Sequence, residues 1–186
     1  MTMSNKEHTK ESYQATAKEF ARNVTNLAPV ESIEKFIDLL PSHAKIIDIG
    51  CGSGRDAKFF TDMGIDVLGI DFCSNLLEIA KAHAPLAKFQ LMDIETISFP
   101  TASFDGAWAA CSLGHIPKNE LPNVLKQIRL LLKEDGYFYL SLKKGSGEIL
   151  EKDSRYDGNH QKFWSFFEEV ELKGFLEKAE KGSNRD

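Results

Sequence analysis

The chain has 186 residues, of which 42% are hydrophobic and 27% are charged, a balance typical of a soluble globular protein. It has 23 Lys and Arg residues against 28 Asp and Glu residues, a net charge of −5. Proteins that bind nucleic acid or anionic membranes usually carry an excess of positive charge, so the composition does not favour either ligand. The sequence has no apolar run of the roughly 18 residues that a membrane span needs, and no secretory signal is expected at its polar start. The 3 cysteines and 5 histidines are scattered, which predicts reduced thiols in a cytoplasmic protein and no metal site.

Short apolar runs alternate with segments of helical periodicity along the chain. Residues 1–43 predict two amphipathic helices that form an N-terminal helical cap. In the core, residues 44–142, strands are expected at 44–50, 66–71, 88–92, 104–110 and 137–142, with helices near 57–63, 76–83 and 121–131. Residues 143–186 predict a loop, a capping box at 165–168 and a last helix. This order predicts one doubly wound α/β domain over residues 1–186, with a mainly parallel sheet and helices on both faces.

The most informative segment is a Gly-x-Gly-x-Gly turn at residues 50–54, which joins the first predicted strand directly to a helix. Glycines permit a tight turn and a close approach of a ligand to the main chain, and helix-start N–H groups favour polar ligand groups. Asp71 ends the second predicted strand, 21 residues after Gly50, a spacing at which a carboxylate meets the ribose of a nucleoside. The segment predicts a nucleoside-containing cofactor; the alternative is a turn that only packs a helix on a strand.

The loop differs from two other nucleotide-binding patterns. The third glycine of the dinucleotide fingerprint would fall at Arg55, and no Lys-Ser/Thr pair follows as in a phosphate-binding P-loop. An NAD-dependent oxidoreductase is therefore the less favoured alternative. The residues Ile46-Ile-Asp48-Ile-Gly50-Cys-Gly52-Ser-Gly54 instead resemble motif I of the class I S-adenosylmethionine-dependent methyltransferases.

This resemblance covers residues 44 to the mid-170s and implies a Rossmann-like fold that binds S-adenosyl-L-methionine. It implies that Asp71 binds the ribose, that Phe72 lies against the adenine and that Asp93, between Met92 and Ile94, accepts from the adenine amino group. Arg55 could pair with the cofactor carboxylate or with Asp56. The remaining cofactor-binding candidates that the resemblance implies are Tyr13, Asp48, Gly50, Cys51, Gly52, Ser53, Gly54 and, through its backbone, Cys111.

Methyl transfer needs a general base only where the acceptor carries a proton that must leave. His115, on the loop after the fourth strand, is the catalytic candidate; the alternative is that it only shapes this loop. Trp164 either seals the core with its aromatic neighbours or lines an acceptor pocket, and Lys143 begins a loop that borders the expected acceptor mouth. The acidic net charge favours a small-molecule acceptor, and a protein that binds the cofactor without chemistry is the main alternative function.

The family sheet normally ends with a strand pair after the last helix, and residues 180–186 are too polar to form one. The pair is therefore expected to be missing, through omission in this branch or truncation of the chain. The fifth strand would then be an uncovered edge of the sheet, and the chain is expected to be either a monomer or a dimer that pairs through this edge strand.

Overall fold

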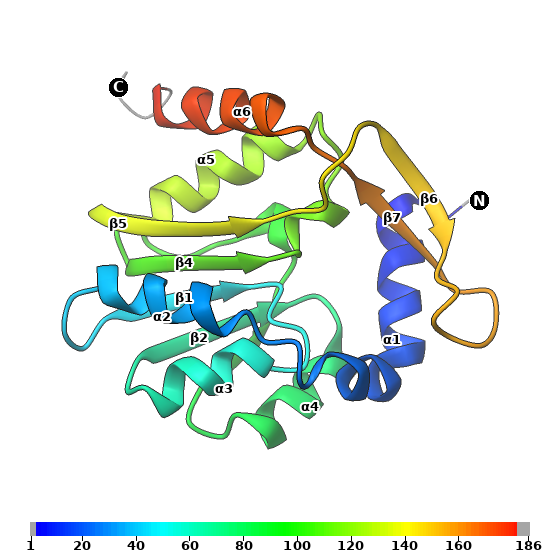
Figure 1. The fold of residues 1–186 in the computed structure, drawn as a ribbon, viewed down its shortest axis with the longest axis horizontal. Coiled ribbons are helices and arrows are strands. Elements are labelled where there is room, and N and C mark those ends of the chain that lie inside the picture. The colour runs from blue at the N-terminus through cyan, green and yellow to red at the C-terminus, as the bar shows by residue number, and fades with distance from the viewer. Residues whose placement is uncertain (1–2, 182–186) are drawn as a thin grey trace.

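A five-stranded parallel sheet forms the centre of the computed structural model, which describes residues 3–181 (Figure 1). Its strand order is β3-β2-β1-β4-β5, and each neighbouring pair is parallel. The strands are β1 (Lys45–Ile49), β2 (Asp66–Asp71), β3 (Lys88–Leu91), β4 (Phe104–Ala110) and β5 (Leu132–Ser141). The predicted doubly wound α/β class is thus confirmed. β5 begins five residues earlier than the apolar run predicts, with a shift in register between Phe104 and Gly106 of β4.

Helices cover both faces of this sheet. The helices are α1 (Asn5–Val24), α2 (Val30–Leu39), α3 (Arg55–Asp62), α4 (Ser74–His83), α5 (Leu121–Leu131) and α6 (Glu169–Lys181). On one face, Phe36 of α2 and Phe60 of α3 pack edge-to-face on Trp108 of β4. On the other face, the apolar stripe of α5 joins β1 and β4 in a second core cluster, with α6 packed against it. Because both faces are buried, the central strands are almost continuously apolar.

Two further strands form where the sequence predicts a loop. β6 (Glu148–Lys152) and β7 (Gln161–Ser165) pair antiparallel in a separate two-stranded sheet, so the prediction of a plain loop after residue 142 is wrong. The capping box is also wrong, because Ser165 lies in β7 and its hydroxyl donates to the Ile116 carbonyl (2.8 Å). β7 contains only two apolar residues, Phe163 and Trp164, after the polar Gln161 and Lys162, and although the Lys162 side chain is fully buried, periodicity does not reveal the strand. In the described residues, no strand follows α6.

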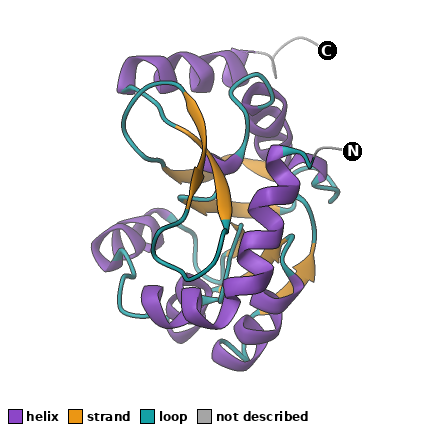
Figure 2. Ribbon diagram, turned by 90° about the vertical axis from the view of Figure 1, so that its right-hand side faces the viewer, coloured by secondary structure: helices purple, strands orange, loops and turns teal. Residues whose placement is uncertain are grey.

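The carboxyl ends of the parallel strands face α1 and the β6–β7 hairpin, as Figure 1 shows. In the view turned by 90°, the hairpin and α1 lie side by side across this end of the sheet (Figure 2). The Phe163 N–H of β7 donates to Thr9 Oγ1 of α1 (2.9 Å), and the Asn75 N–H of α4 donates to Gln14 Oε1 (3.0 Å). The N-terminal helix is thereby fixed over the edge at which ligands of open α/β sheets bind. None of the described helices has the length and hydropathy that crossing a membrane would require.

Candidate functional site

A cavity of about 380 Å³ lies between the carboxyl end of the sheet, α1 and the hairpin, within the range of small-molecule sites. It gathers most of the residues that the sequence singles out. The predicted residues in its wall are Tyr13, Asp48, Gly50, Cys51, Gly52, Ser53, Arg55, Asp71, Phe72, Asp93, Ile94, Cys111 and His115. The sheet, α1 and the hairpin thus bring together residues that lie up to about a hundred positions apart in the chain.

Two predicted cofactor residues lie outside the cavity wall. Gly54 has a φ of +77°, and a Cβ there would meet the Cα and Cβ of Ala80 at 3.0 Å. Its lack of a side chain therefore lets α3 start against α4. Met92 packs its side chain against the core cluster beneath α5, while its N–H donates to the Asp71 carbonyl (3.0 Å). Motif position alone did not distinguish these packing residues from residues that face a ligand.

The glycine loop turns sharply at the end of β1. The N–H groups of Gly50 and Cys51 both donate to the Ile70 carbonyl of β2, at 2.8 and 3.0 Å. Gly50 has a φ of +72°, and a Cβ there would come within 2.3 Å of the Ser112 Cβ. Gly52 has a φ of +55°, but a Cβ there would meet only the Phe20 ring, at 3.4 Å. Gly50 is thus required by packing, whereas Gly52 keeps open the space in front of the loop.

Asp71 is buried at the end of β2 and braces the glycine loop. One carboxylate oxygen accepts from the Gly52 N–H and the other from the Cys73 N–H, each at 2.9 Å. Burial raises the pKa of Asp71 to about 6, and the backbone hydrogen bonds oppose that rise. The carboxylate is therefore ionised at neutral pH but close to its protonation range.

Asp48 is the least satisfied polar group of the site. It is 3% exposed, and its Oδ2 has no hydrogen-bond partner in the described part of the chain. Burial, and then the charge of Asp56, raise the pKa of Asp48 well above its ordinary value, while Arg55 opposes the rise. A buried acceptor without a partner in a cavity wall indicates a place for a ligand donor. This observation fits a bound group that carries N–H or O–H donors.

Arg55 takes the second of its two expected partners. Its guanidinium donates to both carboxylate oxygens of Asp56, at 2.6 and 2.9 Å. Asp56 also accepts from the Trp108 indole N–H at 2.9 Å. This buried arrangement anchors the start of α3 to the centre of the sheet. The sequence gives no sign of it, because Trp108 lies 52 residues from Asp56.

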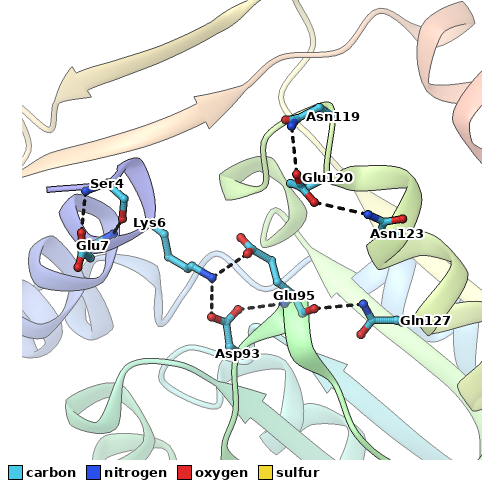
Figure 3. Close-up of polar contacts among 9 residues, drawn as sticks. All are labelled: Ser4, Lys6, Glu7, Asp93, Glu95, Asn119, Glu120, Asn123 and Gln127. Carbon is cyan, nitrogen blue, oxygen red and sulfur yellow. Dashed lines mark hydrogen bonds and ion pairs between the residues drawn. The ribbon is translucent and has the colours of Figure 1, made fainter.

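Lys6 of α1 contacts the segment after β3, an interaction that sequence reasoning missed. Its ammonium group donates to Asp93 Oδ2 (2.9 Å) and to Glu95 Oε2 (2.7 Å), as Figure 3 shows. Asp93 Oδ1 accepts from the Glu95 N–H, and the Glu95 carbonyl accepts from Gln127 of α5. Lys6, Asp93 and Glu95 all line the cavity. The N-terminal helix thus closes this side of the cavity through a partly exposed ion pair, which is worth at most about 1 kcal/mol.

His115 forms a hydrogen-bonded chain with α1 and β7. Its Nδ1 lies 2.7 Å from the Phe163 carbonyl, and its Nε2 lies 2.9 Å from the Tyr13 hydroxyl oxygen. Because a carbonyl only accepts, Nδ1 carries the proton, and Nε2 accepts from the Tyr13 hydroxyl. Burial lowers the pKa of His115 to about 4, with the charges of Lys162 and Lys143 adding to the effect. The imidazole is neutral, and its basic nitrogen faces Tyr13.

Cys111 follows β4 in a left-handed conformation that non-glycine residues rarely adopt, with a φ of +59°. Its N–H donates to the Ser141 carbonyl of β5 (3.0 Å). Strained backbone of this kind is common at ligand sites, where the surrounding structure holds it in place. Cys51, Cys73 and Cys111 are all free thiols.

The wall also contains residues outside the predicted cofactor set; of these, sequence reasoning singled out only Lys143 and Trp164, as neighbours of the expected acceptor. Thr9, Phe20 and Val24 come from α1, and Leu27 and Pro29 from the segment that follows it. Lys143, Arg155 and Trp164 come from β7 and the segments before β6 and β7. Trp164, weighed as either a core seal or a pocket wall, lines the cavity while 7% exposed. An amphipathic pattern identifies the helix α1, but it cannot say which of its residues face a cavity.

A glycine loop after the first strand of a doubly wound sheet, with a buried acid at the end of the second, defines an α/β protein that binds a nucleoside cofactor. Residues 46–136 match the family model described as "Methyltransferase domain". The chain is 25% identical to a solved S-adenosylmethionine-dependent methyltransferase from Methanosarcina mazei, with a TM-score of 0.69 over 82% of this chain and 84% of that one. It belongs to the class I S-adenosylmethionine-dependent methyltransferases.

Two curated relatives have the same family core. A 2-methyl-6-phytyl-1,4-hydroquinone methyltransferase from Synechocystis is 32% identical over 108 residues, which are 53% of this chain and 34% of that protein. A ubiquinone biosynthesis O-methyltransferase from Coxiella burnetii is 28% identical over 123 residues, which are 64% of this chain and 51% of that protein. The chain therefore spans between a third and about half of the length of these relatives.

Proposed function

We propose that this chain is a monomeric cytoplasmic enzyme that transfers the methyl group of S-adenosyl-L-methionine to a small molecule. The observation that carries the proposal is that one cavity is lined both by the acids expected to hold the cofactor and by a candidate proton acceptor. Asp48, whose Oδ2 has no partner in the described residues, and the buried Asp71 line it together with the Tyr13–His115 pair. Residues from both ends of the chain enclose this cavity, which supports treating residues 1–186 as one domain. Bound S-adenosylmethionine would supply an activated methyl group on a sulfonium.

The cofactor-binding residues that we propose are those of the predicted set that line the cavity. Asp71 would accept hydrogen bonds from the ribose, and Asp48 would accept from a donor on the cofactor. The loop residues Gly50–Ser53 would lie against it, with Tyr13, Phe72, Asp93, Ile94 and the Cys111 backbone completing the wall. Arg55 would act indirectly, by holding Asp56 in place. These residues position the cofactor and exclude water, which are the main requirements of methyl transfer.

Tyr13 and His115 would remove a proton from the acceptor when it carries one. The Tyr13 hydroxyl occupies the basic nitrogen of His115, so a proton reaches Nε2 only through Tyr13. In this relay the acceptor proton binds to the Tyr13 oxygen while the proton of Tyr13 moves to His115 Nε2. His115 is then a positioning residue at rest and a proton acceptor during the reaction.

The relay predicts the protonation state of His115. Because burial lowers its pKa, we expect the His115 ring to remain neutral until the pH falls to about 4, with the proton on Nδ1. NMR titration of the ring signals, assigned with His115→Gln, measures both features. A midpoint near the ordinary histidine value of about 6.5, or a proton on Nε2, would contradict the relay.

A small acceptor in the cytoplasm fits the rest of the molecule. The net charge of −5 disfavours nucleic acid, and the cavity is the size of a small-molecule site. Three free thiols suit a reducing compartment. The edge strand β5 starts with the exposed charged residues Lys133, Glu134 and Asp135, which disfavour pairing with a second chain and support a monomer.

Two measurements separate the proposal from its alternatives. Calorimetric titration should show binding of S-adenosylhomocysteine and no binding of NAD⁺. Single-turnover assays of methyl loss from labelled S-adenosylmethionine over a broad acceptor panel should then find an acceptor. Cofactor binding with no transfer over the whole panel would favour a non-catalytic binding protein, and NAD⁺ binding would favour an oxidoreductase.

A further inference from the structure

The wall of the cavity carries opposite charges in two regions. Around the glycine loop, the carboxylates outnumber the cations. The acidic side chains there are Asp56, Asp71, Asp93 and Glu95, together with Asp48, whose pKa burial raises, and the basic ones are Arg55 and Lys6. Around His115 and Trp164 the balance is reversed: the cations are Lys143, Arg155 and, behind the wall, Lys162, and the carboxylates near them are Asp153 and Glu151. The positive charge of this region contrasts with the net charge of −5 of the whole chain.

Lys143 is the cation of this region that the protein leaves without an ion-pair partner. In residues 3–181 no carboxylate comes within ion-pair distance of its ammonium group. The group lies over the Trp164 ring instead, 3.4 Å from its centroid. Burial lowers the pKa of Lys143, and Glu151 is the nearby carboxylate that most opposes this shift. A cation held against an aromatic ring still has donors for a ligand.

The other two cations share one carboxylate. Arg155 donates to both oxygens of Asp153, at 2.8 and 2.7 Å. The fully buried Lys162 lies 3.0 Å from the same Asp153, with its ammonium group 3.8 Å from the centre of the Tyr13 ring. With Glu151 included, three cations face two carboxylates. The region around His115 thus has an excess of positive charge next to the proposed reaction site.

We infer that the methyl acceptor is an anionic small molecule, with a carboxylate or phosphate group that Lys143 and Arg155 bind and an apolar body that contacts Trp164. The inference rests on the proposed function, whose acceptor it specifies. The cofactor carries two positive groups, its sulfonium and its ammonium, against one carboxylate, so its net positive charge suits the acidic region of the wall. An anionic acceptor suits the basic region, so the two charges direct the two ligands to different parts of one cavity.

The test uses the full chain saturated with S-adenosylhomocysteine, and it titrates four aromatic probes of similar size by calorimetry. Benzoate or phenyl phosphate should bind at millimolar concentration, while the neutral benzamide and the cationic benzylamine should not. The stronger of the two anions identifies a carboxylate or a phosphate acceptor. Binding should weaken with added salt, because Lys143 and Arg155 are exposed to solvent.

Lys143→Met should weaken binding of the anion about tenfold, because one charge-assisted hydrogen bond is lost. Lys144→Met is the matched control, since Lys144 is an exposed neighbour outside the cavity wall, and should leave binding unchanged. Equal binding of benzamide and benzoate, no anion binding, or an unchanged affinity in Lys143→Met would overturn the inference. Failure to bind S-adenosylhomocysteine, which is measured first, would instead mark failure of the proposed function.

Discussion

Asp71→Ala is expected to weaken S-adenosylhomocysteine binding about 10- to 100-fold. The carboxylate would lose its hydrogen bonds to the ribose, and such charge-assisted bonds are worth roughly 1.5–3 kcal/mol. In the wild type, the N–H groups of Gly52 and Cys73 donate to the Asp71 carboxylate, and the substitution also removes these two hydrogen bonds. The loop that lies against the cofactor therefore loses its brace as well. Calorimetry measures the affinity, and thermal unfolding reports the state of the fold.

Asp66→Ala is the matched control, because Asp66 starts the same strand, is exposed and pairs loosely with Lys88 at 3.8 Å. It should leave the affinity unchanged. Acid should reproduce the effect of Asp71→Ala in the wild type. Since the pKa of Asp71 is raised to about 6, protonation below that pH removes the charge, and the two proteins should converge in affinity. Equal affinity of Asp71→Ala and wild type at neutral pH would remove Asp71 from the cofactor site.

The sheet could be predicted because its determinants are local. Apolar strands end at Gly50 and Asp71, and the spacing between them places the loop and the acid at one edge. The chemistry of the glycine loop identifies the cofactor class for the same reason. Gly54 shows the limit of this reasoning. Glycine is needed there because the backbone has a positive φ and lies close to Ala80, and only the folded structure reveals that contact.

On the proposed acceptor side, the sequence indicated His115, Lys143 and Trp164 as candidates, but it could not predict their contacts, because the partners are distant in sequence. Tyr13 meets His115 across 102 residues, and Thr9 meets Phe163 across 154. β7 was missed because its polar residues Gln161 and Lys162 give no sign of a buried strand. Lys162 is buried all the same, since it pairs with Asp153 and lies over an aromatic ring. Sequence patterns report which residues prefer to be buried, and a partnered cation breaks that rule. The side of the cavity at which we propose that the acceptor binds is thus the side whose contacts the sequence describes least.

Gly52→Val should abolish S-adenosylhomocysteine binding while the protein remains folded. The backbone there has a φ of +55°, which a β-branched residue strongly resists, and the Gly52 N–H that Asp71 accepts from would shift with it. A Cβ meets only the Phe20 ring at 3.4 Å, so the added methyl groups would extend into the cavity rather than into the core. Calorimetry with circular dichroism separates lost binding from lost structure.

Gly64→Val isolates the cost of the backbone conformation. Gly64 has a φ of +82° with no atom within 4 Å of an added Cβ, and it lies outside the cavity wall. Both variants should lose stability through strain, on the order of 1–2 kcal/mol or more, because a left-handed conformation is costly for any residue with a Cβ. Only Gly52→Val should lose the ligand, since only its side chain enters the cavity. If both variants bind S-adenosylhomocysteine equally well, the cofactor does not lie against this loop.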